Sequence, residues 1–217
     1  MFLGHFALGL ASKNIDKRPS LGTYFLAAQF LDLLWPIFLL LGIEHVVIDP
    51  GNTKFTPLNF VYYPFSHSLL GALIWSACFG IIYYLVKKNY KASILLGALV
   101  FSHWILDLFT HRPDLPLTFS NETKEGMGLW NSFWLSLTIE SIIYAAGVYL
   151  YFKATKAQNK KGSILSWALF IFLAAVYILN AFGPPPPDEK SIAFAGLSLW
   201  LIVAWAYWGD KNRTAAA

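Results

Sequence analysis

Five ionisable side chains lie within the long apolar segments of this chain, and all five could bind a metal ion: Asp32, His67, His103, Asp107 and Glu140. Ionisable groups are costly in the hydrocarbon region of a membrane, so they are candidates for function. None of the five is a lysine or arginine, the residue types expected in a site that holds an anion directly. The set therefore favours a cation, which is either a metal ion or a transported proton.

The strongest local pattern is the sequence from Ser102 to Asp107. His103 and Asp107 are four residues apart, which places an imidazole and a carboxylate on one face of a helix, and His111 continues the same row. Imidazole and carboxylate together suit zinc. A structural hydrogen bond between His and Asp on packed helices is a common alternative for an isolated pair. The neighbouring candidates His67 and Asp32 favour the metal.

One ion cannot reach both ends of this row on a regular helix. His103 and His111 would be about 12 Å apart along an ideal helix. Either the helix breaks near Thr110, which Pro113 favours, or two ions lie on either side of Asp107. Pro36 similarly predicts a kink in the outer half of the helix that carries Asp32.

The composition places these residues in a membrane protein. The 217 residues are 57% apolar and only 13% charged, against about a quarter charged in soluble domains. Cys78 is the only cysteine, which excludes an intrachain disulfide. A membrane-spanning helix needs about 20 apolar residues, with about 17 as the lower limit. Six segments qualify: Leu21–Ile43, Phe65–Val86, Ala92–Phe109, Leu129–Phe152, Ser163–Phe182 and Ser191–Trp208.

These segments predict an all-α, polytopic integral membrane protein with six transmembrane helices in one domain, residues 1–217. Residues 1–115 carry the candidate metal site, and residues 129–208 supply three further spans. Twelve of the sixteen Lys and Arg residues fall in alternate connections, which predicts a cytoplasmic C-terminus. This topology explains the basic excess without a nucleic-acid partner. His67, His103 and Asp107 then lie near the outer ends of their spans, so the site is expected to open outward.

The apolar segment Met1–Ala11 has two possible arrangements. As a helix it would be about 16 Å long, which is half the thickness of a bilayer. It is either an interfacial helix on the inner leaflet or a half-helix inserted into the protein, with His5 near mid-bilayer. Glu140 is expected to bond to a packed helix, with completion of a metal shell as the alternative. His45, beside Glu44 in an outer loop, is expected to be exposed.

The order of the candidate residues resembles a known family. Gly4-His5, Leu31-Asp32, Phe65-Ser66-His67-Ser68, the Ser102–Asp107 segment and His111-Arg112-Pro113 occur in the order seen in predicted inner-membrane metal-dependent hydrolases of the YdjM and YbcI kind. The resemblance covers residues 1–115. That family is thought to be distantly related to soluble zinc-dependent phospholipases C and single-strand nucleases. The resemblance implies the metal ligands His5, Asp32, His67, His103, Asp107 and His111.

The chain departs from those soluble relatives in its second half. They use a further histidine, followed by an acidic residue, on a later helix, whereas this chain has no histidine after His111. One or two ions are therefore expected rather than three. Zinc is the expected metal, with manganese or another divalent ion as alternatives. The relatives also use a free N-terminal amine, a role open to Met1 only if its helix is inserted.

The resemblance implies hydrolysis of a phosphoester at the outer face of a bacterial inner membrane. A lipid or lipid-linked phosphate is the expected substrate class, and Asp32 or Asp107 would accept a proton from the attacking water. Two alternatives stay open. Asp32, Asp107 and Glu140 could relay protons in a small permease, or the metal could only tie helices together.

Overall fold

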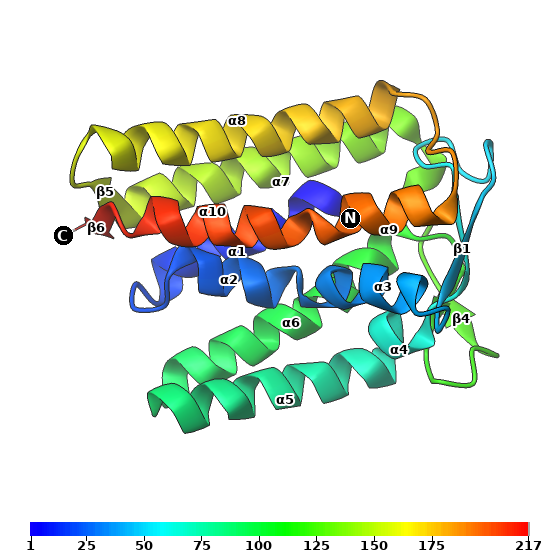
Figure 1. The fold of residues 1–217 in the computed structure, drawn as a ribbon, viewed down its shortest axis with the longest axis horizontal. Coiled ribbons are helices and arrows are strands. Elements are labelled where there is room, and N and C mark those ends of the chain that lie inside the picture. Colours follow the sequence, from blue (N-terminus) through cyan, green and yellow to red (C-terminus); the bar gives the residue numbers. More distant parts are fainter. Residues whose placement is uncertain (217) are drawn as a thin grey trace.

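The computed structural model describes residues 1–216, and it is an all-α protein whose long helices run side by side (Figure 1). The helices are α1 (Phe2–Ile15), α2 (Leu21–Ala28), α3 (Phe30–Leu40), α4 (Pro64–His67), α5 (Leu69–Lys87), α6 (Tyr90–Thr110), η1 (Leu129–Asn131), α7 (Phe133–Ala154), α8 (Lys160–Phe182), α9 (Glu189–Leu197) and α10 (Leu199–Asp210). Three short antiparallel pairs join the ends: β1 (His45–Ile48) with β2 (Leu58–Tyr62), β3 (Leu115–Pro116) with β4 (Lys124–Glu125), and β5 (Thr155–Ala157) with β6 (Arg213–Ala215).

Within residues 1–216, five helical segments are long and apolar enough to cross a membrane, and α2 with α3 makes a sixth if this bent pair is one span. The five are α5, α6, α7, α8 and the combined segment Glu189–Asp210. This confirms the prediction of a polytopic membrane protein. Two other predicted spans are interrupted. His67 belongs to the separate short helix α4, because Ser68 caps the N-terminus of α5 by accepting a hydrogen bond from the Gly71 amide (2.9 Å). A break at Ser198 separates α9 from α10.

The first span is bent at Gln29, whereas the sequence predicted a kink at Pro36. The helices on either side of Gln29 differ in direction by 56°, whereas α3 continues through Pro36. Beside the bend, the carbonyl group of Ala28 lies 2.8 Å from His103 Nδ1. A side chain that enters the backbone hydrogen-bond ladder is a recognised cause of helix bending. The interaction with His103 thus accounts for a bend just before Asp32.

Helix α1 lies inside the bundle, packed along α7 and against α2 and α6 (Figure 1). From Phe2 to Ala11 its residues are apolar except for His5, and most residues of the helix are buried, which is typical of a core helix. The inserted arrangement is therefore the observed one, and an interfacial helix is excluded. Gly147 of α7 permits the close contact, because a Cβ atom there would lie 2.7 Å from the Ala7 carbonyl oxygen.

Polar contacts hold α1 at both ends. Near its C-terminal end, Lys13 Nζ lies 2.8 Å from Asp210 Oδ2 in a buried ion pair. At its first turn, Glu140 Oε2 accepts hydrogen bonds from the amides of Leu3 (2.8 Å) and Gly4 (3.4 Å). A carboxylate at this position satisfies free amide groups and is favoured by the helix dipole. Together these contacts fix the position of His5 relative to the other helices.

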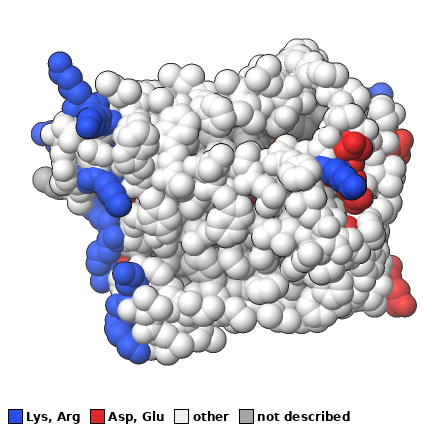
Figure 2. Space-filling view, viewed as in Figure 1, with Lys and Arg blue, Asp and Glu red and all other residues white. Residues whose placement is uncertain are grey.

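Basic and acidic side chains gather at opposite ends of the bundle. Figure 2 shows lysine and arginine side chains gathered at the end that carries β5 and β6, with most of the visible acidic side chains at the opposite end. The basic connections follow α1, α5 and α7 and include the C-terminal segment. The alternate connections predicted to share one side therefore do lie together.

Candidate metal centre

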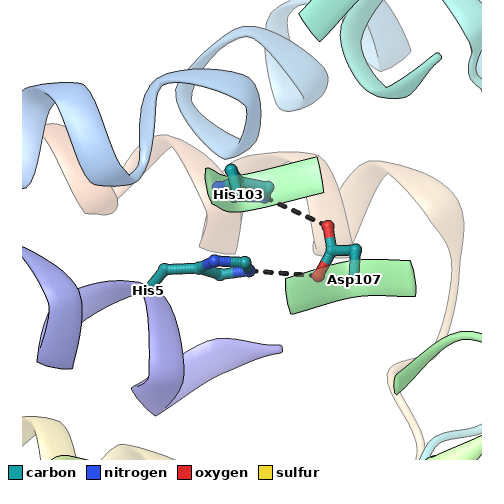
Figure 3. Close-up of side chains that lie close together, drawn as sticks. All are labelled: His5, His103 and Asp107. Atoms are coloured by element: carbon teal, nitrogen blue, oxygen red, sulfur yellow. Dashed lines mark hydrogen bonds and ion pairs between the residues drawn. The ribbon is translucent and has the colours of Figure 1, made fainter. Parts of the chain in front are cut away.

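Five of the six predicted ligands converge between α1, α3, α4 and α6. Two groups of three have ligand atoms within 4.8 Å of one another: His5 with His103 and Asp107, and Asp32 with His67 and His103. Figure 3 shows Asp107 beside the two rings of the first group, with one carboxylate oxygen directed towards each ring. Its Oδ1 atom is 3.1 Å from His5 Nε2, and its Oδ2 atom is 3.2 Å from His103 Nε2.

The second group shares His103 with the first. Asp32 Oδ1 lies 3.3 Å from His67 Nε2 and 3.6 Å from His103 Nε2. The rings of His5 and His103 stack with their centroids 3.5 Å apart. The contacts bring together residues that are up to 102 positions apart in the sequence, and they depend on the insertion of α1 and on the bend before Asp32.

A hydrogen bond on the far side of the His103 ring determines which of its nitrogens carries the lone pair. A carbonyl oxygen can only accept, so His103 Nδ1 must donate to Ala28. In the neutral ring, the lone pair is therefore on Nε2, which faces carboxylate oxygens of Asp32 and Asp107. His67 Nδ1 also has a partner behind the ring, since it lies 2.7 Å from Ser66 Oγ.

His103 Nε2 has no hydrogen-bond partner although it is buried and close to both carboxylates. Acceptors that face one another in this way need a proton or a cation between them. Histidines whose other ring nitrogen is hydrogen-bonded are the usual form of protein zinc ligands. The donor set thus fits a divalent cation.

The two carboxylates differ in accessibility. The Asp107 side chain is 2% exposed and already contacts His5, His103 and the Met1 amino group, whose nitrogen lies 2.5 Å from Oδ1. The Asp32 side chain is 26% exposed. Both line a cavity of about 140 Å³, whose other lining residues are Met1, Phe2, Trp35, Phe60, His67, His111 and Trp130. Asp32 is therefore the carboxylate that a molecule in the cavity reaches more easily.

His111 lies on the cavity wall, outside both groups. Helix α6 ends at Thr110, and His111 follows in an extended conformation, as the prediction of a break near Thr110 requires. Its Nδ1 atom is 2.9 Å from Asp114 Oδ1 and 3.2 Å from the Tyr63 hydroxyl. Burial, together with the negative charge of Asp114, raises the pKa of Tyr63 well above its ordinary value, so this hydroxyl stays protonated.

Glu140 is a hydrogen-bond partner of a packed helix, which was the first of the two expectations for it. Its contacts are to the backbone of α1, and it is absent from both ligand groups of the described residues. The burial of Glu44 was not predicted from the sequence. His45 is 52% exposed as expected, but Glu44 beside it is fully buried and contacts Ser66.

Replacing Glu140 with leucine should destabilise the protein. The amides of Leu3 and Gly4 would lose their acceptor, and hydrogen bonds to a charged group contribute about 1.5–3 kcal/mol each. We expect a lower unfolding temperature in detergent and weaker zinc binding, since His5 would no longer be fixed. Glu140→Gln keeps an acceptor but loses the charge, so its unfolding temperature should lie between those of the leucine variant and wild type. Equal unfolding temperatures for the leucine variant and wild type would contradict this role.

Comparisons with protein-family models, curated proteins and solved structures gave no match to this chain. The likeness to hydrolases of the YdjM and YbcI kind therefore stays a prediction.

Proposed function

We propose that this chain is a membrane-embedded, metal-dependent phosphoester hydrolase. The supporting observation is the pair of ligand groups around His103, in which imidazole nitrogens face two carboxylates beside a cavity. Each group supplies three protein ligands, the usual number in a catalytic zinc site. His103 belongs to both groups, but its ring nitrogen can bind only one ion. A second ion would therefore be held by the remaining histidines and by carboxylate oxygens. We propose one or two zinc ions for this reason.

The proposed division of roles follows accessibility. A bound zinc ion would lower the pKa of a water molecule and stabilise charge on the phosphoryl oxygens. Asp32, the more exposed carboxylate, would accept the proton of the attacking water. Asp107, which is enclosed by His5, His103 and Met1, would hold these groups in place. The aromatic residues Trp35, Phe60 and Trp130 would limit access of bulk water to the cavity.

The proposed substrate is a lipid or lipid-linked phosphate, because Asp32, His103 and Asp107 lie on α3 and α6, which belong to the helical segments that could cross a membrane. One lining residue of the cavity, Phe60, belongs to β2, and the β1–β2 hairpin lies at the end of the bundle opposite β5 and β6 (Figure 1). With the basic end in the cytoplasm, the cavity would open at the outer face of a bacterial inner membrane.

Hydrolysis can be tested directly with the purified chain in detergent. We expect zinc-dependent release of para-nitrophenol from bis(para-nitrophenyl) phosphate and release of a phosphorylated headgroup from phospholipid micelles. A chelator should abolish both activities, and added zinc should restore them. Bound zinc with no turnover, and a lower unfolding temperature after chelation, would instead indicate a structural metal. Proton flux in proteoliposomes without hydrolysis would indicate a permease.

A further inference from the structure

A buried hydrogen-bonded chain extends from His67 away from the ligand group. His67 Nδ1 lies 2.7 Å from Ser66 Oγ, and Ser66 Oγ lies 2.6 Å from Glu44 Oε2. The other carboxylate oxygen, Glu44 Oε1, accepts a hydrogen bond from the Ser66 amide at 2.8 Å. His67 is 4% exposed, and Ser66 and Glu44 are fully buried. Bulk water therefore does not compete for these bonds.

The acceptors fix the direction of each hydrogen bond. An ionised carboxylate can only accept, so the Ser66 hydroxyl donates its single hydrogen to Glu44 Oε2. Ser66 Oγ then has only lone pairs to offer, and His67 Nδ1 must be the protonated nitrogen. The lone pair of His67 is left on Nε2, which faces Asp32 at 3.3 Å. Burial raises the pKa of the Glu44 carboxyl, and the bonds from Ser66 oppose this by stabilising the ionised form.

We infer that Glu44 is a positioning residue that acts through Ser66 to hold His67 in the metal-binding tautomer. This inference rests on the proposed metal site. Hydrogen-bonded partners behind a ligating histidine orient the ring and fix its tautomer, and their loss typically costs about 10- to 100-fold in metal affinity. Each carboxylate oxygen has its own role: Oε1 binds the backbone of α4, and Oε2 orients the serine hydroxyl.

The substitution Glu44→Gln separates these two roles. The Ser66 amide needs an acceptor, so the carbonyl oxygen of glutamine would take the place of Oε1. Its NH₂ group would then replace Oε2 and donate to Ser66 Oγ. Two acceptors then remain for the serine hydroxyl, His67 Nδ1 at 2.7 Å and the Tyr63 carbonyl at 3.5 Å. The shorter contact favours donation to Nδ1, which moves the ring proton to Nε2, where it blocks metal binding. The backbone contact of α4 is retained throughout.

The experiment is a titration of zinc into the full chain in detergent. We expect Glu44→Gln to weaken zinc binding by about 10- to 100-fold, with an unchanged unfolding temperature for the metal-free protein. The exposed residue Glu125 supplies the matched control, Glu125→Gln, which should bind zinc like wild type. In a Ser66→Ala background, Glu44→Gln should cause no further loss, because its route to His67 is absent.

Three outcomes would overturn the inference. Wild-type affinity in Glu44→Gln would exclude a role for Glu44 in the tautomer of His67, whether or not Ser66→Ala folds. Additive losses in the double variant would show that Glu44 acts by another route. A wild-type protein that binds no zinc would remove the proposed metal site itself. Zinc binding by wild type with additive losses would leave the proposed function standing and reject only the role of Glu44.

Discussion

Replacing His103 with alanine should abolish zinc binding. His103 is the only residue common to both ligand groups, and its Nε2 atom lies within 3.6 Å of both Asp32 and Asp107. Its removal takes a ligand from each group and leaves Asp32 and Asp107 without the imidazole that both approach. The loss of affinity should exceed the roughly 10- to 100-fold that accompanies loss of an outer hydrogen-bonded partner. Metal analysis of the purified protein and calorimetric titration with zinc would measure it.

The matched control is His45→Ala. His45 is half exposed and lies outside both groups, with Glu189 as its nearest acidic partner at 3.6 Å. This variant should retain the zinc content of wild type. If His103→Ala bound zinc as tightly as His45→Ala, the metal would have to lie elsewhere, and the proposed function would lose its support.

Replacing Asp32 with asparagine should reduce turnover by about 100- to 10,000-fold, the usual contribution of a general base. Asparagine has nearly the same shape and still offers a carbonyl oxygen, but it cannot accept a proton from water. Zinc should remain bound, although more weakly, because His67 and His103 are unchanged. The kcat for bis(para-nitrophenyl) phosphate at saturating zinc would measure the effect.

An exposed aspartate in the turn after β1 provides the comparison. Asp49→Asn removes a carboxylate of the same type outside both ligand groups and should keep wild-type turnover. A zinc-loaded Asp32→Asn protein with wild-type kcat would show that Asp32 is not the base. Asp107→Asn should differ from the Asp32 and Asp49 variants. Loss of the Asp107 charge leaves the Met1 amino group without its ion-pair partner. This variant should therefore be impaired in folding as well as in zinc binding.

Sequence patterns predicted the helices better than the breaks within them. The length of an apolar segment is a local property, so the long helices α5 to α8 fall where they were expected. The breaks depend on contacts with other parts of the chain. Pro36 is a strong local signal for a kink, yet the bend lies at Gln29, beside the carbonyl that binds His103 from α6.

The types of the candidate residues were also evident from the sequence, but their grouping was not. Spacing related His103 to Asp107 because both lie on one helix, four residues apart. No spacing rule could relate Glu44 to His67, since a loop and a hairpin separate them. The same holds for His111, which follows α6 in an extended conformation and therefore leaves the row of His103 and Asp107.

The sequence by itself determined the environment of this protein and the chemistry available to it. Charged residues are scarce in its long apolar segments, because an ionisable group in the hydrocarbon region needs a partner. Those that remain are carboxylates and imidazoles, which can bind a cation. The tertiary structure decided which of them meet. It placed α1 inside the bundle rather than on its surface, since Gly147 admits close packing and Glu140 satisfies the first turn of the helix. That placement brings His5 against His103, a contact that no local pattern specifies.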